Sequence, residues 1–124
     1  MIERSVSRDD TPQLDAYLED LANSRNRRKQ SRFTDILARF EALSIYGELE
    51  PPREINDLRG SIREIKTAED RILFFEVAAT TRHRRAVRLT NACEKRVSKT
   101  SHGRLPRKHL ELAEAIERID REHG

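Results

Sequence analysis

The segment RILFFEV, residues 71–77, constrains the fold of this chain more than any other. Branched and aromatic residues fill it, and apolar side chains fall on both alternating faces, which is typical of a strand in the middle of a sheet. SIREIK (61–66) and AVRLTNAC (86–93) are also strand-like, and connections this short make neighbouring strands antiparallel. The sequence therefore predicts a small antiparallel sheet of three to four strands, with ERSVS (3–7) as a candidate edge strand.

Helical patterns precede these strands. Thr11 followed by Pro12 is a favourable helix start, and leucines then recur at helical spacing to about Ala22. A second apolar stripe covers residues 27–46 and ends before Gly47, as glycine often follows a helix. The short link between the two stripes predicts an N-terminal helical hairpin.

Two further segments complete the expected organisation. GELEPPREINDLRG (47–60) contains Pro51 and Pro52 and is predicted to be a loop. LPRKHLELAEAIERIDRE (105–122) carries an apolar stripe and is predicted to be a C-terminal helix. The order helix, helix, strands, helix predicts a single α+β domain over residues 1–124, with the helices packed on one face of the sheet.

Composition limits the class of protein. Of the 124 residues, 38% are charged and 35% hydrophobic, which indicates a small core under a heavily charged surface. A single cysteine, Cys93, excludes a disulfide within the chain. No apolar run reaches the length of about 20 residues that a membrane span needs, so we expect a cytoplasmic protein without membrane contacts.

The net charge of +3 conceals an uneven distribution. Basic residues cluster at 25–32, in RHRR at 82–85 and again at 95–108. Clustered cations favour a polyanion such as nucleic acid, but they also fit solvated helix faces, and charge alone leaves both interpretations open. The candidate RNA-binding residues are Arg82, Arg84, Arg85, Arg88 and His102.

Several kinds of site are absent from the sequence. It has no GxxxxGK[ST], GxGxxG, HExxH or GxSxG motif, and its four histidines lack metal-ligand spacing with carboxylates. We therefore expect neither a cofactor nor a metal. A cysteine on a strand is more often a small core residue than a nucleophile, and we interpret Cys93 in that way.

What remains is a group of cations at the strand ends, which a meander of strands would bring to one side. Its members are Lys66, Arg71, Arg88, Lys95, Arg96 and Lys99. Fixed cations of this kind stabilise the charge that develops when a ribose 2′-hydroxyl attacks the adjacent phosphate, without a metal. Glu64, His102 and His109 are the nearest candidates for proton transfer. The alternative is a basic surface that binds an acidic partner.

The motifs LRGSIREIK, DRILFFEV, AVRLTNACEKRVSKT and LPRKHLELAEAIER, in this order, resemble the HigB-like branch of the RelE/ParE toxin superfamily, found in type II toxin–antitoxin modules. IREIK corresponds to a family LWELR pattern, DRILFF to YRVLYF, and NACEKRVSKT to NAFxKKTxKT without a gap. The matching positions are Glu64, Lys66, Arg71, Asn91, Ala92, Lys95, Lys99 and Thr100, with Arg96 in place of a lysine.

The resemblance implies a RelE-like fold and a metal-independent endoribonuclease that cleaves mRNA on the ribosome and is neutralised by a helix-turn-helix, HigA-like antitoxin. It implies RNA-phosphate and transition-state contacts from Lys66, Arg71, Lys95, Arg96 and Lys99. The chain departs from the family pattern where Arg63, Asp70 and Cys93 replace aromatic residues and Val97 replaces threonine. Two alternatives stay open: a ParE-like gyrase inhibitor, and an inactive module that binds an antitoxin or serves a phage.

Overall fold

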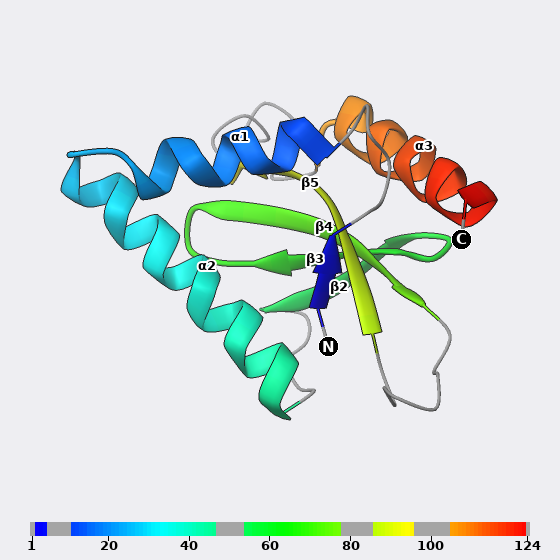
Figure 1. The fold of residues 1–124 in the computed structure, drawn as a ribbon, viewed down its shortest axis with the longest axis horizontal. Coiled ribbons are helices and arrows are strands. Elements are labelled where there is room, and N and C mark those ends of the chain that lie inside the picture. The colour runs from blue at the N-terminus through cyan, green and yellow to red at the C-terminus, as the bar shows by residue number, and fades with distance from the viewer. Residues whose placement is uncertain (1, 5–10, 47–53, 78–85, 96–104, 124) are drawn as a thin grey trace.

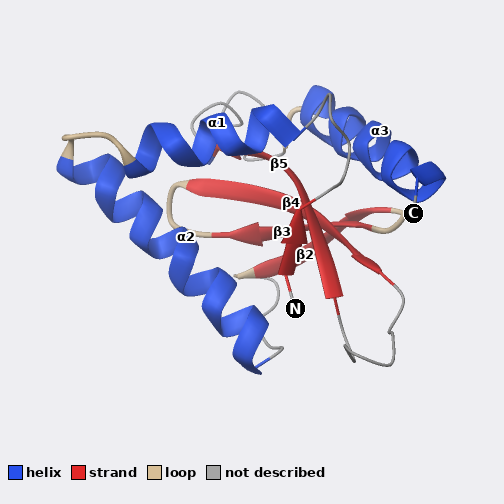
Figure 2. Cartoon of the chain, viewed as in Figure 1, coloured by secondary structure: helices blue, strands red, loops and turns tan. Residues whose placement is uncertain are grey.

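The computed structural model describes residues 2–4, 11–46, 54–77, 86–95 and 105–123 (Figure 1). Two helices, a run of strands and a last helix follow one another in the expected α+β order, which confirms the predicted fold class (Figure 2). The elements are β1 (Ile2–Arg4), α1 (Thr11–Ala22), α2 (Arg27–Tyr46), β2 (Ile55–Arg59), β3 (Ile62–Lys66), β4 (Asp70–Val77), β5 (Ala86–Glu94) and α3 (Arg107–His123).

The sheet has five described strands in the order β1-β5-β4-β3-β2. RILFFEV lies in β4 at its centre, as predicted, and β2 to β5 are antiparallel. Strand β1 adds a parallel edge beside β5. The prediction was wrong for β2, which lies inside the expected loop. Asn56 and Asp57 disfavour strands intrinsically, so pairing with β3 rather than local preference forms this edge strand.

Helices α1 and α2 have the predicted bounds and form a V rather than a close hairpin (Figure 1). The Asn26 side chain caps α2, because its Oδ1 accepts hydrogen bonds from the backbone N–H groups of Arg28 (2.8 Å) and Lys29 (3.3 Å). At the start of α1, the Gln13 amide donates to the Ala92 carbonyl (3.0 Å) and accepts from its N–H (3.1 Å). This pair of bonds fixes α1 to the edge of β5.

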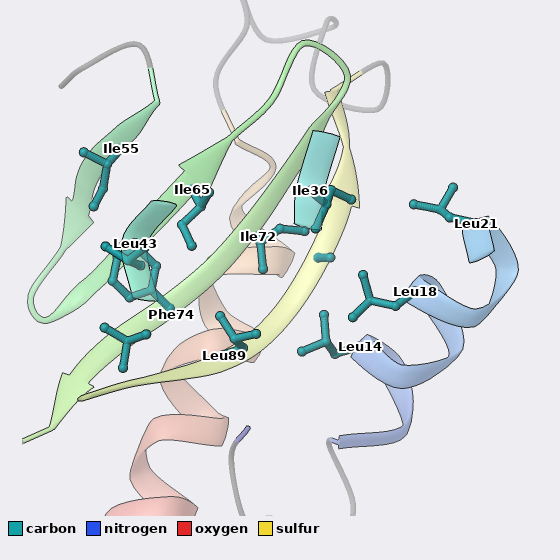
Figure 3. Packing of buried hydrophobic residues seen from close by; sticks show 12 residues of the cluster. Leu14, Leu18, Leu21, Ile36, Leu43, Ile55, Ile65, Ile72, Phe74 and Leu89 are labelled. Atoms are coloured by element: carbon teal, nitrogen blue, oxygen red, sulfur yellow. The ribbon is translucent and has the colours of Figure 1, made fainter. Parts of the chain in front are cut away.

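The larger apolar cluster fills the space between these two helices and one face of the sheet (Figure 3). Its buried members are Leu14, Leu18, Leu21, Ile36, Leu43, Ile55, Ile65, Ile72, Phe74, Val87, Leu89 and Ala92. Full burial of one such large side chain contributes roughly 1.5–3 kcal/mol. This face therefore supplies most of the hydrophobic stabilisation that holds the fold.

Helix α3 covers the opposite face of the sheet, which corrects the expectation that all helices pack on one face. A smaller apolar cluster forms there, with Ile62, Leu73, Phe75 and Ala113 buried. The physical reason lies in β4, where Phe74 belongs to the larger cluster and Phe75 to the smaller one. A strand that is apolar on both sides must be covered on both sides.

A bulge in the β4–β5 pairing changes the direction of the side chains in the second half of β5. Ile72 pairs with Ala92, and Phe74, two residues on, pairs with Leu89, three residues back. One extra residue on β5 therefore shifts the alternation of its side chains between the two faces. Cys93, which strict alternation would place with Leu89 on the α1/α2 face, pairs with Arg71 and lies on the α3 face.

Candidate functional site

The end of the sheet at the β3–β4 turn gathers cations on the α3 face. Lys66 pairs with Arg71 across β3 and β4, and Arg71 pairs with Cys93 across β4 and β5, so these side chains form a row on one face. Lys95 follows Cys93 by two residues and interacts electrostatically with Arg71 and Lys66. The structure thus brings together three of the predicted site residues, Lys66, Arg71 and Lys95, which we call the cationic cluster.

An open groove of about 360 Å³ lies beside the cluster. Its lining residues come from β2, β3, β4, the segment before α3, and α3 itself: Asn56, Leu58, Glu64, Lys66, Arg71, Leu105 and Leu110. The lining combines the charged side chains of Glu64, Lys66 and Arg71 with the apolar side chains of three leucines. This combination suits a ligand that carries both an anionic group and a flat apolar part.

Glu64 and Arg71 form a buried ion pair in the groove. Arg71 Nη1 lies 3.2 Å from Glu64 Oε2 and 3.5 Å from Oε1, and Glu64 is only 2% exposed. A buried carboxylate needs such a partner, because an uncompensated charge away from water is costly. Arg71 therefore both holds Glu64 in place and presents its own positive charge to the groove.

Lys95 has a pKa below the ordinary value for lysine. Burial is the main cause, and repulsion from Arg71 and Lys66 adds to it, while Glu64 and Asp70 act in the opposite direction. Burial and the neighbouring cations thus both act against the charged form of Lys95. A bound anion would reduce the repulsion among Lys66, Arg71 and Lys95.

The backbone of Lys66 is fixed on both sides. Its N–H donates to the Glu54 carbonyl (2.8 Å), and its own carbonyl accepts from Arg39 Nε (3.2 Å). Within the part of the chain that the structure describes, no carboxylate forms an ion pair with the Lys66 ammonium. The backbone of Lys66 is thus held in place by two hydrogen bonds, and its half-buried side chain lines the groove.

Cys93 behaves as a core residue, as the sequence predicted. It is 4% exposed, and burial raises the pKa of its thiol to about 11. At neutral pH the thiol is protonated, and a protonated thiol is a poor nucleophile. Cys93 is therefore a buried cross-strand neighbour of Arg71 and a poor candidate for a nucleophile.

His109 lies on the first turn of α3 but does not line the groove. Its Nε2 is buried and has no hydrogen-bond partner among the described residues, and burial, followed by Lys108, lowers its pKa. Its carbonyl accepts a hydrogen bond from the Asn91 amide (3.1 Å). Since His109 does not line the groove, it is a weaker candidate for proton transfer there than Glu64, which does.

Arg88 lies on the α3 face but away from the groove. Its Nη1 is 3.0 Å from the buried Asp120 of α3, so one contact it makes fastens this helix to β5. Six other predicted site residues fall outside the described residues: Arg82, Arg84, Arg85, Arg96, Lys99 and His102. Their roles stay predictions.

The aromatic positions that this chain replaces lie mostly on the other face. The Arg63 guanidinium stacks 5.8 Å from the Phe74 ring centroid and pairs with Asp57 (2.6 Å), and Asp70 binds residues of α1 and α2. Only Cys93 lies on the groove face. The loss of aromatic residues therefore alters the α1/α2 face more than the candidate site.

Sequence reasoning missed four groove residues, which come from β2 and from the start of α3. Asn56 and Leu58 lie in the segment predicted as a loop, and Leu105 and Leu110 were predicted only as part of a helix. A usable signal was the alternation of Ile55 with Asn56, which predicts a strand with one apolar and one polar face.

Two classes of site find no support in the described ranges. No group of three or more His, Cys, Asp or Glu side chains could hold a metal ion there, and no helix there has the length and apolar character to cross a bilayer. Comparison with known proteins identifies no matching family model and no matching curated protein. The function must be inferred from the groove and the cationic cluster.

Proposed function

We propose that this chain is the toxin of a type II toxin–antitoxin module, of the HigB-like branch of the RelE/ParE superfamily, and that it cleaves mRNA on the ribosome. The observation that carries the proposal is the cationic cluster, Lys66, Arg71 and Lys95, at a groove that also presents the Glu64 carboxylate. The family motifs in the sequence contribute the nature of the substrate.

The proposed reaction is attack of a ribose 2′-hydroxyl on the adjacent phosphate. The new bond joins O2′ to phosphorus, the bond to the 5′-oxygen of the next nucleotide breaks, and a 2′,3′-cyclic phosphate and a 5′-hydroxyl result. Negative charge grows on the phosphoryl oxygens, and Arg71 with the two lysines stabilises it. Glu64 is the proposed acceptor of the 2′-hydroxyl proton, and a protonated group or water returns a proton to the leaving oxygen.

The groove favours one nucleotide of a single strand. Its volume of about 360 Å³ is at the lower end of the range for small-molecule sites. Leu58, Leu105 and Leu110 offer an apolar wall for the face of an unstacked base, while the cluster holds the phosphate. Single-stranded RNA is recognised in this way, with bases splayed from the stack.

The proposal implies three partners: mRNA, the ribosome, and a helix-turn-helix antitoxin. It also implies a cytoplasmic location, where messages are translated. A gyrase inhibitor and an inactive binding module use the same superfamily fold. No feature of the groove favours either, so they enter as outcomes of the test.

The test is induced expression in bacteria with mapping of mRNA 5′ ends, comparing the wild type with Lys95→Ala. Lys95 is preferable to Arg71, because removal of Arg71 leaves Glu64 buried and unpaired. Lys29→Ala is the matched control, since Lys29 pairs with Asp20 on the surface and its loss also removes one positive charge. We expect growth arrest and cuts within translated messages for the wild type and the control, and relief in Lys95→Ala.

Two results would overturn the proposal. Arrest with intact messages and gyrase-linked DNA breaks would assign the chain to the gyrase inhibitors. Normal growth with the wild-type chain present in folded form would assign it to the binding modules. Equal arrest by wild type and Lys95→Ala with message cleavage would keep the activity but remove the cluster as its site.

A further inference from the structure

The four-residue turn Thr67–Asp70 at the junction of β3 and β4 connects to the backbone of all three residues of the cationic cluster. Lys66 precedes it and Arg71 follows it. The N–H of Lys95 donates to the Glu69 carbonyl (2.8 Å). The distances between the three cations therefore depend on the conformation of this one turn.

The turn is closed internally by a buried threonine. The hydroxyl of Thr67 accepts from the N–H of Asp70 (3.0 Å), and the N–H of Thr67 donates to the Asp70 carbonyl (3.0 Å). Thr67 is 4% exposed. These bonds fix the local shape of the turn but not its position relative to the rest of the sheet.

A buried polar network on the opposite face fixes that position. The carboxylate of Asp70 is fully buried and accepts two hydrogen bonds from Arg32 of α2, from Nη2 (2.7 Å) and Nε (3.0 Å). The Tyr17 hydroxyl of α1 donates to the same carboxylate, and Arg28 of α2 pairs with Glu69. Figure 1 shows the turn inside the V of α1 and α2. We call Tyr17, Arg32 and Asp70 the anchor network.

The physical need for such an anchor comes from the cluster itself. Lys66, Arg71 and Lys95 repel one another, and a turn at the end of a sheet yields to such a force unless it is tied elsewhere. A buried ion pair is a poor means of gaining stability, because apolar side chains of the same volume often do as well. A two-bond guanidinium–carboxylate contact does supply fixed direction.

We propose that the anchor network positions the cationic cluster for its anionic ligand, with Tyr17, Arg32 and Asp70 acting as positioning residues from the far face of the sheet. This inference rests on the proposed function for its meaning in catalysis. The geometric part of the inference, that the network sets the spacing of the three cations, does not depend on the proposed function. The experiment separates the two.

The first variant is Tyr17→Phe, which removes one hydroxyl and no charge. The first readout is kcat and KM for cleavage of a short single-stranded RNA by the purified chain in the presence of ribosomes. The second is the titration of the Lys95 ammonium, followed by NMR of labelled lysine. We expect kcat to fall by roughly 10- to 100-fold with KM little changed, because misplacement by a fraction of an ångström to 1 Å affects the transition state most. The Lys95 pKa should rise toward its ordinary value as the cations move apart.

A second variant is needed in case the anchor network keeps its geometry without the Tyr17 hydroxyl. Arg32→Met with Asp70→Asn removes both charges together, so no buried charge is left unpaired. Ile36→Val is the matched control, since it removes one buried methyl group from α2, one turn beyond Arg32, and no polar contact. We expect the double variant to repeat the fall in kcat and the control to leave kcat unchanged. The Lys95 pKa is compared only in Tyr17→Phe and Ile36→Val, because loss of the Asp70 carboxylate by itself lowers that pKa.

The outcomes separate the two proposals. If both folded variants keep the wild-type kcat and Tyr17→Phe also keeps the wild-type Lys95 pKa, the anchor network is only structural and the inference is wrong. If the wild type cleaves no RNA, the proposed function is wrong, and the Lys95 titration still decides whether the network sets the cluster. A fall in kcat that Ile36→Val reproduces equally would trace the effect to stability and also overturn the inference.

Discussion

Two consecutive residues of β4 show how the faces of this sheet differ. Asp70 points to the α1/α2 face, where Arg32 and Tyr17 close around its carboxylate. Arg71 points to the α3 face, where it pairs with Glu64 beside an open groove and near two lysines. One face encloses the Asp70 carboxylate between a guanidinium and a hydroxyl, while the other gathers three cations around the Glu64 carboxylate beside an open groove.

The difference extends to packing. The apolar cluster described on the α1/α2 face has twelve buried members, whereas the cluster on the α3 face has four. On the α3 side, Asn91 Oδ1 and His109 Nε2 also lack hydrogen-bond partners among the described residues. Polar groups left in this state cost stability. The comparison teaches that one face holds the fold together, and that the other retains unsatisfied groups where a ligand or water can use them.

The largest test of this comparison sets Phe74→Ala against Phe75→Ala. Both rings are fully buried, Phe74 in the larger cluster and Phe75 in the smaller one. Truncation of a buried phenylalanine costs roughly 3–5 kcal/mol. We expect Phe74→Ala near the upper limit and Phe75→Ala near the lower, because Phe74 packs in the larger cluster and Phe75 in the smaller one. A long arginine side chain lies over each ring, Arg63 over Phe74 and Arg121 over Phe75, so this contact does not distinguish the two variants. Urea unfolding measures both, and an equal or larger loss in Phe75→Ala would contradict the division between faces.

The next test separates stability from charge on the groove face. Arg71→Ala leaves the Glu64 carboxylate buried without this partner, and we expect the free energy of unfolding to fall by about 3 kcal/mol. The double variant Arg71→Met with Glu64→Leu replaces the pair by apolar side chains, and most of that loss should disappear, while RNA cleavage stays absent. Urea unfolding and the cleavage assay are run on the same samples. A double variant as unstable as Arg71→Ala would mean that the pair itself supports the fold.

Much of the architecture was predictable because it follows from local periodicity. The bounds of α1 and α2 and the central position of β4 come from apolar spacing that no other structure satisfies as well. Strand β2 was not predictable in this way, since Asn56 and Asp57 favour turns and only pairing with β3 makes them a strand. The cover of α3 on the second face is also a tertiary property, although the apolar residues on both sides of β4 indicate that some cover is needed.

The candidate site was predictable in its residue types and not in its construction. The cations Lys66, Arg71 and Lys95 stand out from their positions at strand ends. Strict alternation along β5 would have sent Cys93, which precedes Lys95 by two residues, to the same face as Leu89, and only the bulge brings this end of the strand to the face of the groove. The anchor beneath the cluster joins Tyr17 and Asp70, 53 residues apart in the chain, and no local pattern announces such a contact.

The smallest expected effect is the change in stability at alkaline pH that comes from two titrating groups, one on each face. Burial raises the pKa of the Cys93 thiol on the groove face from 9.0 to about 11. Burial and the hydrogen bond to Asp70 also raise the pKa of the Tyr17 hydroxyl above its ordinary value of 10.0. A group with a raised folded pKa stabilises the fold fully below its unfolded pKa, and this contribution is lost as pH rises. Cys93 should therefore begin to destabilise the chain above pH 9, and Tyr17 only above pH 10.

Urea unfolding between pH 8 and 11, in reducing buffer, measures this difference. One pKa unit corresponds to about 1.4 kcal/mol, so Cys93 should account for a loss of about 2 kcal/mol that Cys93→Ala lacks. Lys95 acts in the opposite direction, because its lowered folded pKa makes stability rise with pH below 10.5. Each variant is therefore compared with the wild type at the same pH. Parallel curves for wild type and Cys93→Ala would mean that water reaches the thiol, and the groove would then extend beneath the cluster to the bulge of β5.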